Sequence, residues 1–475
     1  FLTRSVRDLH RIDVCTYTLG EDSIVPVVKE RMNTYQETRP IHVLNGGKEF
    51  IQWSERDGWA HLYLYDDKGN LKNRITEGPW HVERVVKVDE ATRTVYFVAN
   101  GREKGENPYY EHFYKVNVNG SGLKQLTHGE FFHDVEMDDE ARFFVDNYSR
   151  ANTIPCADLL DRNGNKVMTI QESDFSSLKA AGYQFPEPFK VKAADGVTDL
   201  YGVMWKPADF DSTKVYPIIS NVYPGSFFEY VPTRFTINDV YNTRLAQLGF
   251  IVITVGHRGG TPMRGKAYHT YGYNNMRDYP LADDKYAIEQ LAARYPFIDA
   301  TKVGIYGHSG GGFMSAAAIC TYPDFYSAAV SSAGNHDNRI YNKGFVEIHF
   351  GVDEKVKTTK DSLGVESTMY DYSVRVRPNQ ELVKNYKHGL LLFTGAMDKT
   401  VNPANTLRLV DALIKADKDF EMFVLPKCTH GFFGESEDFF EHKMWRHFAR
   451  LLLHDNSADS DVDLNKDMIK DDRRR

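Results

Sequence analysis

The sequence predicts an α/β domain with a mostly parallel, doubly wound sheet over residues 186–455, preceded by a β-sheet domain over residues 1–185. Three observations predict this division. Aromatic-rich segments with the two-residue period of strands fill the first part. In the second part, short continuous apolar segments alternate with helical segments, which is typical of βαβ units. A strand, a glycine-rich turn and a small-residue helix also follow one another at residues 302–320.

The composition of the chain is that of a large globular protein with a net negative charge. It has 475 residues, of which 41% are hydrophobic, and a formal net charge of −8. We expect no nucleic acid as a partner, because phosphate binding requires a basic face. No apolar run reaches the roughly 18 residues of a transmembrane helix, so the sequence predicts no membrane segment.

The cysteines and the start of the chain are uninformative about structure. The cysteines form no CxxC pair, so the sequence predicts neither a disulfide framework nor a structural zinc site, and we expect no metal and no cofactor. The chain opens with FLTRSVRDLH, which has no initiating Met and no signal-peptide pattern. We therefore expect that the natural protein begins upstream. The cysteines are Cys15, Cys156, Cys320 and Cys428.

Strand-like segments in the first part are separated by turns of similar chemistry. The turns are DDKGN, NGSG and DRNGN, and their glycines Gly69, Gly120 and Gly164 recur at intervals of roughly 40–50 residues. Four-stranded units of this length are typical of β-propeller blades. We predict part of a β-propeller, and a β-sandwich with irregular loops is the alternative. The strand-like segments are 50–54, 61–66, 94–100, 112–118 and 141–149.

The second part alternates buried strands with helices, after a segment that reads as hairpins at residues 186–207. The charged segment 456–475 is nearly free of apolar residues, so we expect a solvated and poorly ordered extension. The predicted strands are 217–222, 251–255, 302–307, 328–333, 390–395 and 420–426, and the predicted helices are 278–295, 310–321, 404–417 and 436–453.

The sequence GHSGGG at 307–312 has the G-x-S-x-G pattern in the strand–turn–helix context that a nucleophilic serine requires. The flanking glycines leave room for a tight turn and for close approach of the backbone. Ser309 would project from this turn at the carboxyl end of the sheet, and the N–H of Gly310 would point at a developing oxyanion. A glycine-rich turn without chemistry is the alternative interpretation.

A serine becomes a good nucleophile when a base takes its proton and a carboxylate fixes the tautomer of that base. In the α/β-hydrolase order these residues follow the serine as Asp and then His, each after a strand. Asp398 follows LLLFTG, and His430 follows FEMFVLP. The order predicts an α/β-hydrolase fold with Ser309, Asp398 and His430 as its triad; a turn-forming Asp398 and a loop His430 are the alternatives. Less well placed candidates are Asp411, Asp419, His388, His442 and His447.

Residues 190–455 resemble the catalytic domain of the prolyl oligopeptidase family of serine peptidases, and residues 1–185 resemble the later propeller blades of its dipeptidyl peptidase IV branch. The resemblance implies Ser309 as nucleophile, Asp398 as orienting carboxylate and His430 as general base and then acid. The motifs that carry it are QWSERDGWAHLYLYDDKGN (52–70), GHSGGGF (307–313), GAMDKTV (395–401) and CTHGF (428–432).

The resemblance also implies how the substrate is held. Tyr223, in NVYPGS, stands where this branch has a tyrosine that donates to the tetrahedral oxyanion, with the N–H of Gly310 as the second donor. A tyrosine that only fills the pocket wall is the alternative. The candidate substrate-binding residues at the remaining aligned positions are His308, Tyr341, Phe345, Thr400 and Val401.

Several positions depart from the pattern of this branch. Gly310 stands in place of a tyrosine, His308 of a tryptophan, Phe345 of a tyrosine and Thr400 of an asparagine. The pair of glutamates that grips the amino terminus of the substrate is not visible, and we expect it upstream of residue 1. The resemblance therefore transfers the mechanism better than it transfers a proline preference or the release of dipeptides.

We expect serine-type hydrolysis of short peptides through an acyl-enzyme, by a dipeptidyl-peptidase-like exopeptidase. The alternatives are an acylaminoacyl peptidase or esterase on the same triad, and a non-catalytic binding protein on a hydrolase fold. The resemblance implies a peptide substrate, and it suggests a homodimer and a periplasmic or secreted location.

Overall fold

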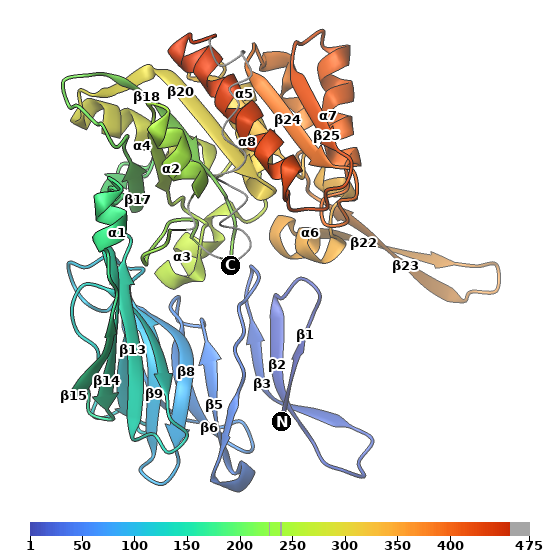
Figure 1. Cartoon of the computed structure of the whole chain (residues 1–475). Coiled ribbons are helices and arrows are strands. Elements are labelled where there is room, and N and C mark those ends of the chain that lie inside the picture. The colour runs from blue at the N-terminus through green and yellow to red at the C-terminus, as the bar shows by residue number, and fades with distance from the viewer. Residues whose placement is uncertain (228, 238–239, 457–475) are drawn as a thin grey trace.

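A computed structural model of the chain describes residues 1–227, 229–237 and 240–456 (Figure 1). The strands of the first part stand on one side of the α/β part, and α1 (Ser176–Ala180) lies where the two meet. The last strand of the first part ends at Glu172 and the first strand of the second begins at Glu187. The extension predicted over residues 456–475 lies, apart from its first residue, outside the described residues.

Four antiparallel sheets, each formed by strands that are consecutive in the sequence, make up the first part and form the predicted partial β-propeller. The strand-like segments predicted from the sequence begin at the second strand of each four-stranded sheet. The first strand has only three residues in one of these sheets and carries many polar residues in the other two. The sheets are β1 (Leu2–Ser5), β2 (Arg11–Tyr17) and β3 (Ile24–Arg31); β4 (His42–Leu44), β5 (Glu49–Ser54), β6 (His61–Asp66) and β7 (Leu71–Arg74); β8 (His81–Asp89), β9 (Thr94–Asn100), β10 (Glu111–Asn117) and β11 (Lys124–Gln125); and β12 (Phe132–Met137), β13 (Phe143–Arg150), β14 (Thr153–Asp161) and β15 (Lys166–Glu172).

The repeating turn glycines occupy the same place in each blade, between its third and fourth strands. Gly69, Gly120 and Gly164 have φ values of 81°, 86° and 82°, a region that favours glycine. Each turn also touches the preceding sheet: a Cβ at Gly164 would lie 2.6 Å from the carbonyl oxygen of Leu126, and one at Gly120 would lie 3.0 Å from that of Arg74. The repeat in the sequence therefore marks the contact between neighbouring blades.

The second part is built on one eight-stranded sheet in the order β16-β17-β19-β18-β20-β21-β24-β25. β17 pairs antiparallel with both of its neighbours, β16 and β19, and all the other neighbouring pairs are parallel, which agrees with the predicted α/β-hydrolase fold. Its central strands are buried on both faces and therefore read as continuous apolar segments. The strands are β16 (Glu187–Lys192), β17 (Asp199–Trp205), β18 (Tyr216–Asn221), β19 (Ile251–Val255), β20 (Ile298–His308), β21 (Tyr326–Ser332), β24 (Leu390–Gly395) and β25 (Glu421–Leu425).

Helices cover both faces of this sheet and bury two separate apolar clusters. On one face lie α4 (Leu281–Arg294), α5 (Gly310–Thr321) and α7 (Ala404–Lys415). On the other lie α2 (Val240–Gln247) and α8 (Glu435–Phe448). The four predicted helices are present, whereas α2, the short α3 (Lys266–His269) and α6 (Lys343–Phe350) were not predicted. Shorter helical turns are Asn45–Gly47, Pro262–Arg264, Thr270–Gly272, Asn338–Ile340, Asn379–Glu381, Val383–Asn385 and Ala449–Leu453.

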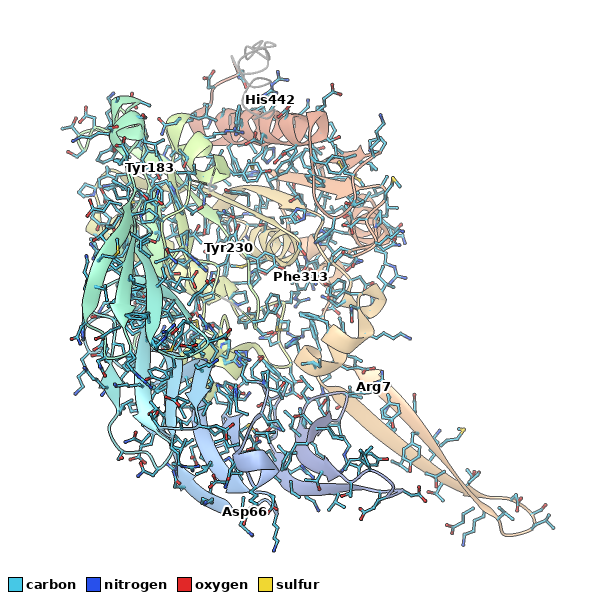
Figure 2. All side chains as sticks on the ribbon, turned by 60° about the horizontal axis from the view of Figure 1, so that its bottom comes forward. Arg7, Asp66, Tyr183, Tyr230, Phe313 and His442 are labelled. Atoms are coloured by element: carbon cyan, nitrogen blue, oxygen red, sulfur yellow. The ribbon has the colours of Figure 1, made fainter. Side chains whose placement is uncertain are left out.

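A two-stranded hairpin of β22 (Val352–Lys360) and β23 (Glu366–Val374) projects from the end of α6 (Figure 1). Its side chains extend away from both domains. Arg7, in the turn between β1 and β2, lies near its base, where it pairs with Glu347 of α6 (Figure 2). This hairpin was not predicted from the sequence. Within the described part of the chain, no helix is both long and apolar enough to cross a membrane.

Candidate active site

Ser309 lies in a sharp turn between the end of β20 and the start of α5. Its φ of 57° and ψ of −118° are unusual for a residue with a Cβ, and its N–H donates to the carbonyl oxygen of Ser332 at 2.8 Å. Such a strained backbone places a side chain at the top of a sheet. Ser309 is 8% exposed, so its hydroxyl lies at the floor of a site and not on the open surface.

The glycines around Ser309 make this turn sterically possible. A Cβ at Gly311 would overlap the carbonyl oxygen of Val222 in the loop after β18, and a Cβ at Gly307 would overlap the same oxygen. A Cβ at Gly312 would lie 2.5 Å from the carbonyl oxygen of Ser332. Three of the glycines in GHSGGG therefore allow close packing of backbone on backbone, as the sequence motif predicts.

Ser309, His430 and Asp398 form a continuous hydrogen-bonded row. Nε2 of His430 is 3.0 Å from Oγ of Ser309, and Nδ1 of His430 is 2.8 Å from Oδ2 of Asp398. Asp398 is buried after β24, and its Oδ1 accepts the backbone N–H groups of Thr400 and Val401, each at 2.8 Å. The two acceptor bonds fix the carboxylate, which in turn fixes the tautomer of His430.

The other candidates for the base and the carboxylate lie elsewhere. Asp411 pairs with Lys415 on α7, and Nε2 of His447 faces the carbonyl oxygen of Gly389. His442 packs against Trp445 on α8. These contacts are ordinary helix-surface and core contacts, so the structure brings only Asp398 and His430, among the candidates described, to Ser309.

A second histidine lies beside the row. The ring of His308 is 4.8 Å from that of His430, centroid to centroid, and its Nδ1 is 3.0 Å from Oγ of Ser332. Burial, together with the neighbouring His430, lowers the pKa of His308 to about 4. His308 is therefore neutral at pH 7 and packs on the imidazole of His430 as an uncharged ring.

Tyr223 lies against the turn, after β18. A Cβ at Gly310 would be 3.7 Å from the Tyr223 ring and 3.1 Å from the carbonyl oxygen of Pro224, so the ring covers the backbone next to Ser309. Burial raises the pKa of the Tyr223 phenol, while the contact of its hydroxyl with the Ser309 side chain lowers it. The net shift is upward, so the phenol stays protonated and can donate a hydrogen bond.

A pocket of about 450 Å³, counted to its open mouth, opens in front of Ser309. It contains Tyr341 and Phe345, two of the five predicted substrate-binding residues. Its wall is mainly aromatic, with Asn335 as the one amide side chain among the lining residues described. The lining residues are Tyr223, Pro224, Phe227, Met276, Ser309, Gly310, Phe313, Asn335, Tyr341, Phe345 and Phe350.

The other three predicted substrate-binding residues are not among those lining residues. His308 faces His430, Thr400 is exposed, and Val401 is 1% exposed and serves Asp398 through its backbone N–H. Their contacts with a substrate stay a prediction. Phe313 was not predicted as a pocket residue, although it follows Ser309 by one helical turn on α5 and that spacing could have indicated it. Met276 and Phe350 carry no such signal, because they reach the pocket from distant segments.

Two known family models match this chain, one in each of its two parts. Residues 238–454 match the model of the prolyl oligopeptidase family, and residues 2–155 match that of the dipeptidyl peptidase IV N-terminal region. Residues 238–454 therefore form a domain of the prolyl oligopeptidase family. The chain is similar to human dipeptidyl peptidase 8, with 28% identity over 86% of this chain and 48% of that protein.

Two fungal proteins have a similar level of sequence identity to this chain. The probable dipeptidyl-aminopeptidase B of Aspergillus oryzae is 27% identical over 85% of this chain and 44% of that protein. The probable dipeptidyl peptidase 4 of Aspergillus fumigatus is 26% identical over 77% of this chain and 46% of that protein. The chain therefore spans about half the length of the curated relatives that it matches.

Two solved structures share the fold of this chain. A putative dipeptidyl aminopeptidase IV from Bacteroides ovatus superposes with a TM-score of 0.81 and 23% identity over 95% of this chain and 64% of that one. The dipeptidyl peptidase 4 of Porphyromonas gingivalis superposes with a TM-score of 0.80 and 21% identity over 95% of this chain and 61% of that one. In both comparisons the superposition extends over the first and the second part of this chain.

Proposed function

We propose that this chain carries a serine peptidase site that hydrolyses short peptides through an acyl-enzyme, in the manner of a dipeptidyl peptidase. The observation that carries this proposal is the row from Oγ of Ser309 through His430 to buried Asp398, with links of 3.0 and 2.8 Å. Release of dipeptides is supported by the names of the relatives, which are dipeptidyl peptidases.

Each residue of the site has a specific role in this reaction. Oγ of Ser309 attacks the substrate carbonyl carbon while Nε2 of His430 takes its proton, and Asp398 stabilises the imidazolium that forms. The Tyr223 hydroxyl and the N–H of Gly310 donate to the oxyanion of the tetrahedral intermediate. His430 then gives its proton to the leaving amine, and a water molecule repeats the sequence to release the acyl group.

The pocket is suited to bind an apolar side chain of the substrate next to the cleaved bond. Aromatic rings from three segments surround it, and such walls gain free energy by excluding water from an apolar group. Phe345 supplies no hydroxyl, and Asn335 adds a single polar group. A ring as small as that of proline and larger apolar side chains both suit this pocket, and the substrate panel below distinguishes between them.

The experiment is labelling with a fluorophosphonate probe followed by a substrate panel. The panel contains chromogenic dipeptides of the types Xaa-Pro, Xaa-Ala and Xaa-Phe, each with a free and with an acylated amino terminus. We expect labelling and turnover of free-amine dipeptides by the wild-type chain, and neither by Ser309→Ala. Turnover of acylated substrates alone would favour an acylaminoacyl peptidase or esterase. A wild-type chain that neither labels nor turns over any substrate would overturn the proposal.

A further inference from the structure

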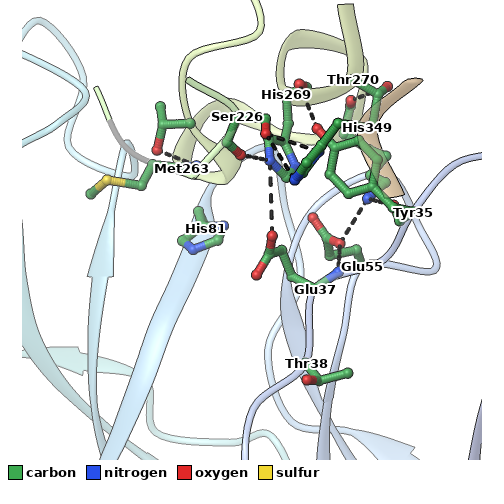
Figure 3. A network of polar contacts seen from close by, with 12 residues as sticks. Tyr35, Glu37, Thr38, Glu55, His81, Ser226, Met263, His269, Thr270 and His349 are labelled. Carbon is green, nitrogen blue, oxygen red and sulfur yellow. Dashed lines mark hydrogen bonds and ion pairs between the residues drawn. The ribbon is translucent and has the colours of Figure 1, made fainter. Parts of the chain in front are cut away.

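A buried polar network joins the propeller to two of the segments that line the substrate pocket (Figure 3). Its centre is Ser226, which follows Tyr223 by three residues and directly precedes Phe227 of the pocket wall. Nε2 of His269, on α3, donates to the backbone carbonyl of Ser226. Oγ of Ser226 lies 3.0 Å from Nδ1 of His349, on α6. Ser226 is therefore held through its backbone and its side chain at the same time.

Both histidines are neutral hydrogen-bonding groups. Burial lowers the pKa of His269 to about 4 and that of His349 to about 3. Because a carbonyl oxygen only accepts, Nε2 of His269 carries the proton, and its buried Nδ1 has no hydrogen-bond partner among the described residues. Neither imidazole lies in the row at Ser309, so their chemistry is not used in the proposed reaction.

The propeller contributes Tyr35, from the segment between β3 and β4. Its ring fits between the two histidines, 5.1 Å from the ring of His269 and 4.7 Å from that of His349, edge-on to both. The Tyr35 hydroxyl donates to the backbone carbonyl of His269 at 3.3 Å and also contacts the Ser226 side chain. Tyr35 is 2% exposed, so the whole side chain is enclosed between the two domains.

An ion pair fixes the backbone of Tyr35. Nζ of Lys266 donates to the carbonyl oxygen of Tyr35 and lies 2.9 Å from Oε2 of Glu55, a buried propeller residue. The Lys266 N–H also donates to the carbonyl oxygen of Gly58 at 2.8 Å. The position of Tyr35 relative to the hydrolase domain is therefore determined at its backbone, its ring and its hydroxyl.

Two short structural connections link this network to the proposed active site. Pro224 restricts the backbone between Tyr223 and Ser226, so a displacement of Ser226 displaces the phenol beside Ser309. On α6, the ring of Phe345 lies 4.5 Å from that of His349, one helical turn away, and Phe345 lines the pocket. One propeller side chain thus contacts both the loop of the oxyanion donor and the helix of the pocket wall.

We propose that Tyr35 is a positioning residue, supplied by the propeller, that sets the place of Tyr223 through Ser226 and of Phe345 through His349. The inference rests on the proposed function for its kinetic consequence. It assigns the propeller a direct part in forming the site, because Tyr35 packs against both histidines that hold Ser226 and also contacts the Ser226 side chain.

The test is a double-mutant cycle between Ser226→Ala and Tyr223→Phe, with Tyr35→Phe as a second probe of the same path. We expect Ser226→Ala to lower kcat by roughly ten- to a hundredfold, because small misplacements of catalytic groups have effects of this size. We expect KM and Tm to change little. In the Tyr223→Phe background the same substitution should change kcat by less than about twofold, because coupled residues are not additive.

The matched control is Tyr114→Phe, which removes another buried phenol hydroxyl of the propeller, 2.9 Å from Glu103, and should leave kcat unchanged. Hydrogen exchange supplies a readout that needs no turnover: Tyr35→Phe and Ser226→Ala should speed exchange at residues 222–227 and 343–350, whereas Tyr114→Phe should not. Additive effects on kcat in an active wild-type background, or unchanged exchange at both segments, would overturn the positioning role alone. An inactive and unlabelled wild-type chain would overturn the proposed function instead, and the exchange result would still decide the structural part.

Discussion

Oδ2 of Asp398 lies 2.8 Å from Nδ1 of His430, while Oδ1 of the same carboxylate is held by two backbone N–H groups. The carboxylate is fully buried, so its orientation is fixed before a substrate binds. A buried acceptor in this position keeps the proton of the imidazole on Nδ1 and leaves Nε2 free to accept the proton of Ser309. A change that removes this acceptor should therefore impair the base without disturbing the fold.

Asp398→Asn should keep the fold and lower kcat by about 10⁴-fold, because an amide can donate to Nδ1 and thereby favour the wrong tautomer. Steady-state kinetics on a dipeptide substrate that the wild-type chain cleaves measures the loss. Asp411→Asn is the matched control, since Asp411 pairs only with Lys415 on the surface of α7 and should leave kcat unchanged. Equal activity of the two variants would contradict the assignment of Asp398.

Tyr223→Phe should lower kcat by about 10²- to 10³-fold with little change in KM, because a donor to the oxyanion acts mainly in the transition state. Tyr341→Phe, a second tyrosine of the pocket, should change kcat by only a few-fold. Side-by-side measurement of kcat and KM for the two variants separates oxyanion stabilisation from filling of the pocket wall. A loss in KM alone for Tyr223→Phe would favour the wall interpretation.

Gly311→Ala should destabilise the protein, because its Cβ would overlap the carbonyl oxygen of Val222 and force two backbone segments apart. We expect a loss of about 1–3 kcal/mol in the free energy of unfolding, as for other overpacked sites. The control is Gly431→Ala, since a Cβ at Gly431 meets no atom within 4 Å. Urea unfolding of both variants measures the difference, and an unchanged midpoint for Gly311→Ala would show that the turn has more room than the structure gives it.

Stability should fall as the pH decreases from 6.5 to 4, because buried histidines remain neutral in the folded protein. Burial lowers the pKa of His269 to about 4 and that of His336 to about 3, from 6.5 in the unfolded chain. The unfolded chain therefore binds protons in this interval that the folded chain does not bind, and each pKa unit corresponds to about 1.4 kcal/mol per histidine. Glu111 acts in the opposite direction, since burial raises its pKa to about 8.

Urea unfolding at pH 7.5, 6.5, 5 and 4 measures this dependence. His269→Gln should show a smaller decrease between pH 6.5 and 4 than the wild-type chain, because one depressed group is absent. A wild-type midpoint that stays constant between pH 7.5 and 5 would contradict the prediction.

Much of the site could be predicted from the sequence, because the relevant signals are local. Ser309 is marked by its glycines, whose small size is a direct requirement of the turn. Asp398 and His430 are marked by their places after apolar strands, and parallel strands bring their carboxyl ends to one edge of a sheet. The blade repeat was visible for the same reason, since Gly69 and its counterparts satisfy a local backbone requirement.

The remaining features depend on contacts between distant segments. The pocket wall draws Met276, Phe313 and Phe350 from three separate elements, and only Phe313 is related to Ser309 by helical spacing. Tyr35 carries no motif, and its role follows from its place between His269 and His349. The hairpin β22–β23 escaped prediction because its exposed strands mix charged and apolar residues without a buried face.

The sequence by itself determined the order of the domains, the nucleophile and the two groups that follow it, because a tight turn and a buried strand each require particular residues nearby in the chain. Only the tertiary structure decided the lining of the pocket and the contact of the propeller with the loop of Tyr223. Those depend on packing across distances of up to some hundreds of residues along the chain, where close contact in space leaves no periodic pattern in the sequence.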